Sequence, residues 1–413
     1  MLLIGITGFC VKPLRDSGVM TIPELFEKRF GKFVRWLSGV VIVLGGLLNM
    51  GVFLRIGGEF LVLVTGMNPD YLVITMTLLL IMVAVYTILG GMLSVLVTDF
   101  LQFIVMSIGL LAVTYLILGT VGWSSIVSTV EKEHGVGGFN PFLHPKLGWE
   151  YVLAHAFVQI AATLTWQTTI ARLLAAKDTW TGQKIYIGTS FFFACRFLIP
   201  GLWGIAALAM LPPGLIGSSS EHTTLNAMPI YLGTLVPIGL MGLLVAAMLA
   251  ADMSTDSSYM ITWAAVIYND ILAPFRKGKT SEKTGILISR MIVAAIGVFL
   301  FFYGLFYKLE GGLWDYLTTT GTVYLSSMSV LLIACCYWKK ANSWSAIASI
   351  VVGAAFPIGY LVLEKTIAGG AEVLKQDYYF TQDRAKIAAF VLSAVSMVVF
   401  SLLKPLKKTE VST

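Results

Sequence analysis

The sequence predicts an all-α integral membrane protein, and three observations support this fold class. Of the 413 residues, 57% are hydrophobic and 12% are charged, whereas roughly 25% are charged in an average soluble domain. The mean hydropathy is +0.85. The apolar residues gather in long runs without the period-2 alternation of a membrane β-barrel. Disorder and collagen-like or disulfide-rich scaffolds are excluded, because apolar residues dominate, the 40 Gly follow no triplet period and only four Cys occur.

Ten apolar stretches are long enough to cross a bilayer as helices. An α-helix rises ~1.5 Å per residue, so about 20 residues span the hydrocarbon core. The predicted spans are Trp36–Leu63, Tyr71–Leu89, Val95–Leu118, Tyr151–Ala171, Tyr186–Leu211, Val236–Ile267, Ile286–Phe306, Tyr316–Trp338, Trp344–Leu363 and Ile387–Leu403. The run Met1–Val11 is too short to span and lacks the basic start and cleavage site of a signal peptide. We interpret it as the back half of a helix whose front half is absent from this chain.

The basic residues predict the orientation of these spans. If successive loops alternate between the two sides and residues 12–35 are cytoplasmic, 19 of the 28 Lys and Arg residues lie inside and seven outside. This bias fits the positive-inside rule. It places the C-terminus in the cytoplasm and the segments 119–149 and 364–386 outside. The pI near 9.0 therefore reflects membrane topology, and no nucleic-acid partner is expected.

Ionisable residues inside apolar runs mark candidate functional positions, because charges are costly in hydrocarbon and usually face a bundle interior or a water-filled path. Arg55 and Glu59 are four residues apart and can neutralise each other on a helix. Arg196 has no partner nearby in the sequence. The full set is Arg55, Glu59, Asp99, Arg196, Asp252 and Asp256.

The segment 250–258 offers oxygen ligands for a small cation. On a helix, Ala251, Ser254, Thr255 and Ser258 follow the spacing i, i+3, i+4, i+7 and share one face. Hydroxyls and helix carbonyls on one face are hard oxygen donors. The alternative is that the hydroxyls donate to carbonyls one turn earlier or join neighbouring helices.

Two polar stripes are expected to point into the bundle and, with Asn49, to line a chamber near mid-membrane, where transporter sites lie. The alternative is that they hydrogen-bond one helix to another. The first stripe recurs every four residues and consists of His155, Gln159, Thr163 and Gln167. The second recurs at intervals of three and four residues and consists of Asp315, Thr318, Thr322, Ser326 and Ser329.

Four stretches resemble the sodium/solute symporter family, which includes the sodium/glucose and sodium/proline cotransporters. They are TIPELFEKRFG (21–31), YTILGGMLSVLVTDFLQ (86–102), RLLAAKD (172–178) and AADMSTDSSYM (250–260), which runs on to IYNDI. The similarity covers nearly the whole chain in unbroken order. It implies the LeuT-type fold, two inverted five-helix repeats followed by extra helices. In a single transporter domain, 1–120 would be a partial first repeat, 149–340 the second repeat and 341–413 the extra helices.

The resemblance also implies that the first core helix and the front of the second precede Met1. We therefore expect ten full spans plus a partial helix, and roughly 60–90 further N-terminal residues in the full protein. We also expect these 413 residues alone to leave an open groove beside Ala251–Ser258, and to neither bind Na⁺ usefully nor transport.

The family's site residues carry over position by position. The resemblance implies a sodium site that takes the carbonyl of Ala251 and the hydroxyls of Ser254 and Thr255, with further carbonyls from the missing helix. A second sodium site, found in some members, implies Asp99 with Thr255 and two further hydroxyls, which are Ser257 and Ser258. Asp256 departs from many relatives, which have an apolar residue there, and it could strengthen a cation site or carry a proton.

The positions that match sugar contacts in a sodium/galactose relative are Asn49, Gln159 and Thr318. The relative's aromatic inner gate and sugar-binding lysine align with Ala162 and Phe193, so a sugar is not favoured over an organic anion. Arg196 lies one turn further on and could bind a carboxylate. The alternative is that Arg196 pairs with one of two buried carboxyl groups, those of Asp252 and Asp256.

The resulting hypothesis is a sodium-coupled symporter of the plasma membrane that imports a sugar, an amino acid or an organic anion by alternating access. Na⁺ is the coupling ion, and no organic cofactor is expected. The alternatives are a sensor or channel on the same fold and an inactive truncated fragment. An enzyme is not expected, because none of the four His has metal-ligand spacing such as H-E-x-x-H. The four Cys imply neither disulfides nor zinc; they are Cys10, Cys195, Cys335 and Cys336.

Overall fold

The computed structural model describes residues 1–135, 138–144, 147–212, 215, 224–275, 281–309, 312–367, 370–376 and 379–404. The regular elements in these ranges are helices. The α-helices are α1 (Leu2–Thr7), α2 (Val11–Asp16), α3 (Ile22–Phe30), α4 (Lys32–Met50), α5 (Phe53–Thr65), α6 (Leu72–Val121), α7 (Trp123–His134), α8 (Gly148–Thr165), α9 (Gln167–Leu174), α10 (Thr179–Met210), α11 (Ala227–Leu235), α12 (Ile238–Val266), α13 (Glu282–Phe306), α14 (Leu313–Tyr337), α15 (Ser343–Thr366), α16 (Gly370–Gln376) and α17 (Gln382–Leu403). Shorter elements are the 3-10 turns η1 (Pro69–Tyr71), η3 (Thr224–Asn226) and η5 (Ala273–Phe275), and the π-helix η4 (Ile267–Leu272).

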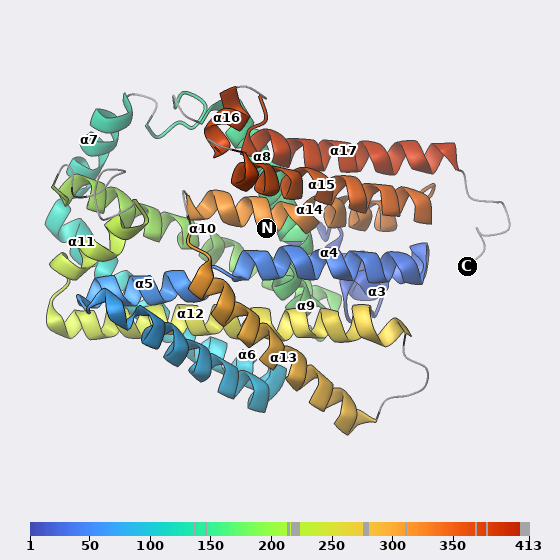
Figure 1. Ribbon diagram of the computed structural model, residues 1–413, viewed down its shortest axis with the longest axis horizontal. Helices are drawn as coiled ribbons and strands as arrows, with labels where there is room; N and C mark the ends of the chain where they lie inside the picture. Colours follow the sequence, from blue (N-terminus) through green and yellow to red (C-terminus); the bar gives the residue numbers. More distant parts are fainter. Residues whose placement is uncertain are drawn as a thin grey trace.

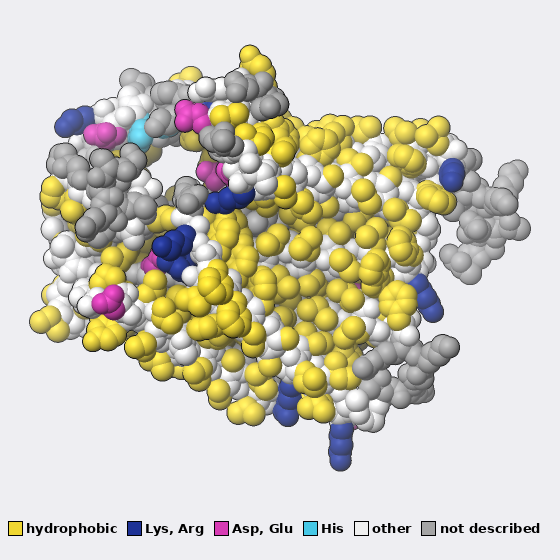
Figure 2. Space-filling model, in the orientation of Figure 1, with side chains coloured by type: hydrophobic (Ala, Val, Ile, Leu, Met, Phe, Trp, Pro, Cys, Tyr) yellow, Lys and Arg dark blue, Asp and Glu magenta, His cyan; other side chains and the backbone are white. Residues whose placement is uncertain are grey.

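The long helices form a bundle that is suited to a bilayer. Within the part of the chain that the structure describes, eight helical segments are long and apolar enough to cross a membrane. Most of them run along one common direction (Figure 1). Hydrophobic side chains cover the middle of the visible face, while charged side chains gather mostly toward its two ends (Figure 2). An apolar belt between polar ends is the surface that a membrane-spanning bundle presents.

The predicted spans agree with these helices except in three places, one of which is Trp36–Leu63, divided between α4 and α5 at Gly51 and Val52. Tyr71–Leu89 and Val95–Leu118 both fall in α6, whose backbone leaves the helical region at Gly91 (φ 63°, ψ −162°). Glycine adopts a positive φ without steric cost, so Gly91 divides α6 into two helical halves. The predicted span Tyr151–Ala171 is wrong as a continuous helix, because the extended backbone of Trp166 (φ −65°, ψ 112°) separates α8 from α9.

The ends of the bundle agree with the alternating topology. Figure 1 places α7 and α16 toward one end and the C-terminal end of α17 toward the other. This is the arrangement required if 119–149 and 364–386 share one side of the membrane and the C-terminus lies on the other. Six of the basic residues used to predict orientation lie outside the described residues; they are Lys146, Arg276, Lys277, Lys279, Lys407 and Lys408.

Lys386, which the orientation count includes among the outside charges, is a buried residue of a helix rather than part of an exposed loop. It lies at the start of the second turn of α17 with its side chain 0% exposed. Its ammonium is 3.2 Å from an Asp383 carboxylate oxygen and 4.0 Å from an oxygen of Asp315 on α14. A buried lysine needs such compensation, because desolvation of an unpaired charge is expensive. Lys386 therefore contributes to the contact between α17 and α14.

Two of the motifs that resemble the symporter family contain the N-cap residue of a helix. Thr21 caps α3 by accepting a hydrogen bond from the backbone N–H of Glu24 at 3.2 Å. Asp178 caps α10, where the Thr181 N–H donates to its carboxylate at 2.7 Å. This backbone hydrogen bond lowers the pKa of Asp178, because it stabilises the charged form. Both caps satisfy backbone donors that have no partner within the helix.

The IYNDI motif joins the end of α12 to the start of the chain. It forms the π-helix η4, and its Asp270 is 0% exposed. One Asp270 oxygen accepts from Arg35 Nε and from the Thr21 hydroxyl, both at 2.8 Å. Arg35 also pairs with Glu27 at 2.5 Å. The motifs at 21–31 and 267–271 are therefore parts of one buried polar contact that holds η4 against α3 and α4.

Candidate functional site

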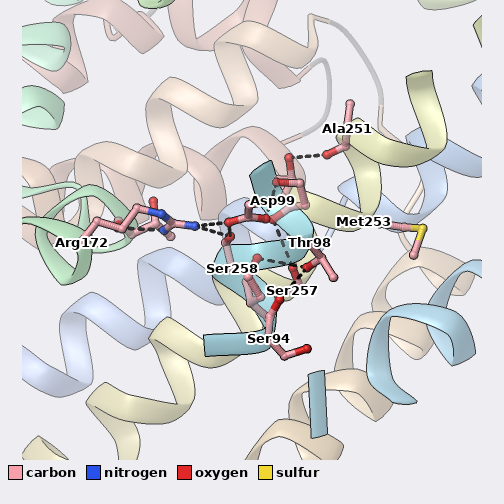
Figure 3. A network of polar contacts seen from close by, with 12 residues as sticks. Ser94, Thr98, Asp99, Arg172, Ala251, Met253, Ser257 and Ser258 are labelled. Carbon is pink, nitrogen blue, oxygen red and sulfur yellow. Dashed lines mark hydrogen bonds and ion pairs between the residues drawn. The ribbon is translucent and has the colours of Figure 1, made fainter. Parts of the chain in front are cut away.

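A cluster of oxygen atoms forms where α12 packs against α6 and α9 (Figure 3). Asp99 of α6 lies at its centre. The Ser254 hydroxyl donates to Asp99 Oδ1 at 2.6 Å, and the Ser258 hydroxyl donates to Asp99 Oδ2 at 3.4 Å. Arg172 of α9 donates to Asp99 Oδ2 at 2.6 Å and to the Ser258 hydroxyl at 2.7 Å. The structure thus brings together three predicted residues and adds Arg172.

The residues predicted for the first sodium site lie beside this cluster. The Thr255 hydroxyl donates to the Ala251 carbonyl at 2.8 Å, which is the self-satisfying arrangement left open by the sequence. Ser254 instead uses its hydroxyl on Asp99 and connects the two groups. Ser257 is fully buried and donates to the Ser254 carbonyl at 3.3 Å. The two cavities lined by Arg55 and by Gln167 lie elsewhere in the described part of the chain, and the open groove beside Ala251–Ser258 stays a prediction.

Arg172 supplies the positive charge of the cluster. Arg172 is the first residue of the RLLAAKD motif and one of the 19 basic residues expected inside, but its place in the cluster was not predicted. Its guanidinium also donates to the Thr168 carbonyl at 3.0 Å, which fixes its direction. Because Asp99 is already paired with a cation, a second cation at Asp99 and Ser258 must compete with the guanidinium.

Asp252 and Asp256 present buried carboxyl oxygens on the same helix. Asp256 is 1% exposed. Both of its oxygens, and one oxygen of Asp252, have no hydrogen-bond partner in the described part of the chain. The predicted alternative of pairing with Arg196 is not seen there: its guanidinium lies over the rings of Phe193 and Phe197, at 5.8 and 5.7 Å. By contrast, the prediction that Arg55 and Glu59 neutralise each other is confirmed by an ion pair of 2.7 Å.

Three of the four predicted solute residues, all except Arg196 of α10, lie on α4, α8 and α14. Asn49 of α4 donates its amide to the Leu317 carbonyl at 2.7 Å and to the Thr320 hydroxyl at 3.1 Å. Thr318 of α14 is 3% exposed and donates to the Asp315 carbonyl at 3.1 Å. Gln159 of α8 is half-buried. Asn49 is therefore joined to α14 beside Thr318, while neither described cavity is lined by any of the three.

The break at Trp166 is a site feature that the sequence analysis missed. The Trp166 ring packs against Tyr259 and Tyr324, each at 6.0 Å between ring centroids. The next residue, Gln167, has a buried amide nitrogen without a hydrogen-bond partner in the described residues. It lines a cavity of ≈ 40 Å³ together with Thr262. Discontinuous helices of this kind supply polar groups to transporter sites. Neither Gly nor Pro, the usual signals of a break, occurs at 165–167.

Comparisons with known proteins agree with this architecture. The sequence model described as "Sodium:solute symporter family" matches residues 1–353. The osmoregulated proline transporter OpuE of Bacillus subtilis is 25% identical, over 81% of this chain and 67% of its own length. The sodium/glucose cotransporter of Vibrio parahaemolyticus is 27% identical, over 83% of this chain and 66% of its own length. The sodium/myo-inositol cotransporter of Mus musculus is 24% identical, over 86% of this chain and 55% of its own length.

A solved structure has the same fold. It is a Na⁺-coupled sialic acid symporter in a substrate-bound outward-open state, with a TM-score of 0.76 at 19% identity. The match covers 98% of this chain and 81% of that chain. The chain spans between about half and two thirds of the length of the curated relatives.

Proposed function

This chain belongs to the sodium:solute symporter family, and we propose that it imports a small organic solute by sodium-coupled alternating access. The family match and the eight candidate spans identify a multi-pass protein of the plasma membrane. Family members are transporters rather than enzymes.

The observation that carries the proposal is the cluster of oxygen atoms on α12. The carbonyl of Ala251 and the hydroxyls of Ser254 and Thr255 would hold the coupling Na⁺, because a hard cation prefers oxygen ligands. These three residues are half-buried, and the Ser254 hydroxyl now donates to Asp99 at 2.6 Å, so it would have to turn its oxygen toward the ion. The Thr255 hydroxyl hydrogen must turn away from the Ala251 carbonyl when both oxygens face the ion.

A second Na⁺ would use Asp99, Ser257 and Ser258. This site is weaker than the first, because the guanidinium of Arg172 already occupies the carboxylate at 2.6 Å. Occupancy of the second site therefore requires Arg172 to move, and Asp99 would then exchange one cation for another.

The solute would contact Asn49, Gln159, Thr318 and Arg196. Arg196 forms no ion pair within the described ranges and its side chain is exposed, so its guanidinium is available to a carboxylate. Among the three classes open from the sequence, this favours a solute that carries a carboxylate, an organic anion or an amino acid, over a neutral sugar. The relatives named above act on proline, glucose, myo-inositol and sialic acid.

Uptake into proteoliposomes tests the proposal. The complete protein is purified, reconstituted and offered labelled proline, glucose, myo-inositol, sialic acid and simple carboxylates, under an inward Na⁺ gradient or an equal K⁺ gradient. We expect accumulation of one class above equilibrium with Na⁺ only, and its collapse when an ionophore dissipates the gradient. Uptake that is equal in Na⁺ and K⁺, or no accumulation of any solute, would contradict the proposal.

A further inference from the structure

The cavity lined by Arg55 lies where α5 meets the end of α13, toward the end of the bundle that holds α7 and α11 (Figure 1). Its volume is ≈ 190 Å³. An engineered apolar cavity of about 150 Å³ binds benzene, so this one has room for a small ring or a chain of similar size. Its lining residues come from α5 and the residue before it, from η3 and from the three residues that follow α13. The cavity is therefore separate from the oxygen cluster on α12.

The cavity is lined by two cationic residues and one anionic residue. Arg55 is held in place, because its Nε donates to a Glu59 carboxylate oxygen at 2.7 Å and its Nη1 donates to the Gly304 carbonyl at 3.1 Å. Within the described ranges, neither Arg55 Nη2 nor the exposed residue Lys308 has a hydrogen-bond or ion-pair partner. Because Glu59 neutralises one of the two cations, the lining keeps one positive charge. A cleft lined by an excess of positive charge attracts an anion.

Most of the remaining lining is aliphatic. It consists of Val52 and Ile56 on one side of the Arg55 helix position, with Leu225 and Leu309 from the other two segments. Small-molecule sites typically combine an apolar lining with a few polar groups that fix the orientation of the ligand. A ligand that matches this cavity therefore has one anionic head and a small apolar body.

We propose that this cavity is a second ligand site, which binds a small monocarboxylate with an apolar body and does so independently of sodium. The carboxylate would accept from the Lys308 ammonium and from Arg55 Nη2, and such charge-assisted hydrogen bonds are stronger than neutral ones. A second carboxylate on the ligand would be repelled by Glu59. Lys308 is among the seven basic residues expected outside, so the ligand would enter from the external medium.

Equilibrium binding of radiolabelled benzoate to the complete protein in detergent tests the proposal. Benzamide is the matched probe, because it has nearly the same shape and no charge. We expect saturable benzoate binding that is equal in NaCl and in KCl at constant ionic strength, and that unlabelled benzoate displaces far better than benzamide does. Benzoate binding that requires Na⁺ would overturn the proposal and assign the ligand to the sodium-coupled site. Equal displacement by benzamide would also overturn it, because the cavity would then not recognise the charge.

Variants of Lys308 locate the bound benzoate. Lys308→Gln should weaken binding at least about tenfold, whereas Lys308→Arg keeps the positive charge and should retain most of the affinity. Lys132→Gln is the control, because Lys132 is an exposed lysine of α7 that does not line the cavity. Unchanged binding in Lys308→Gln, or an equal loss in Lys132→Gln, would contradict the assignment. The comparison of benzoate with benzamide uses the wild-type protein, so it does not depend on the folding of a variant.

Discussion

Removal of the Arg172 guanidinium is expected to make the stability of the protein depend on sodium. In the structure the Asp99 carboxylate accepts from Arg172 and Ser254 at 2.6 Å each, and from Ser258 at 3.4 Å. Arg172→Met keeps an extended apolar side chain and leaves the carboxylate with hydroxyl partners only. A half-buried carboxylate without a counter-charge is destabilising, and a small cation held by oxygen ligands can compensate it.

The solvent exposure of the two side chains sets the size of the expected loss of stability. The side chains of Arg172 and Asp99 are 30% and 17% exposed, so the pair lies between a surface pair and a buried one. Surface pairs contribute up to about 1 kcal/mol, and removal of one partner of a buried pair costs about 3–5 kcal/mol. We expect Arg172→Met to lose about 2 kcal/mol without sodium and to recover most of it at saturating Na⁺. Asp99→Asn should lose stability without any recovery by Na⁺.

Thermal unfolding in detergent checks this, with tryptophan fluorescence as the signal and choline chloride replacing NaCl at constant ionic strength. The double variant Asp99→Asn/Arg172→Met completes a cycle that isolates the energy of the pair. If Arg172→Met is destabilised equally in Na⁺ and in choline, Asp99 is not a cation ligand and the reasoning is refuted.

Two further predictions concern packing and a buried charge. Gly57→Ala should cost about 1–3 kcal/mol, because the added Cβ would lie 2.5 Å from Asp252 Oδ1. Gly119→Ala meets nothing within 4 Å and is the matched control; equal melting temperatures for the two variants would contradict the close approach. Lys386→Met should cost about 1–2 kcal/mol, because it leaves the 24%-exposed side chain of Asp383 without its ammonium partner. A denaturation midpoint no lower than that of wild type would show that this ammonium contributes nothing.

The helical fold could be predicted because span length and hydropathy are properties of local sequence. The ion pair between Arg55 and Glu59 could also be predicted, because residues four apart lie side by side on any helix. The break at Trp166 could not be predicted, because the mean hydropathy of Tyr151–Ala171 is unchanged when one backbone ψ turns from helical to extended. No local residue signals that turn, and the packing of Trp166 between Tyr259 and Tyr324 accompanies it.

Ion pairs between residues far apart in the sequence were also not predicted. Arg172 and Lys386 lie at the edges of apolar runs, where a sequence gives no reason to choose between solvent and a partner on another helix. Their partners are 73 and 71 residues away, Asp99 and Asp315 respectively. Asp99 and Ser258 could be assigned to one site only through the resemblance to a family, because spacing on one helix does not show what faces it, and the bond from Ser254 to Asp99 was not predicted.

The sodium requirement of uptake in the variant Ser254→Ala/Thr255→Ala tests the central claim most directly. The initial rate is measured against Na⁺ concentration in proteoliposomes, with Ser401→Ala as the control, because its hydroxyl donates to a carbonyl one turn earlier at 2.6 Å, as that of Thr255 does. We predict that the double variant needs at least about tenfold more Na⁺ for half-maximal uptake, ~1.4 kcal/mol, and that Ser401→Ala is unchanged. An unaltered sodium requirement in the double variant would contradict the assignment of the ion to α12.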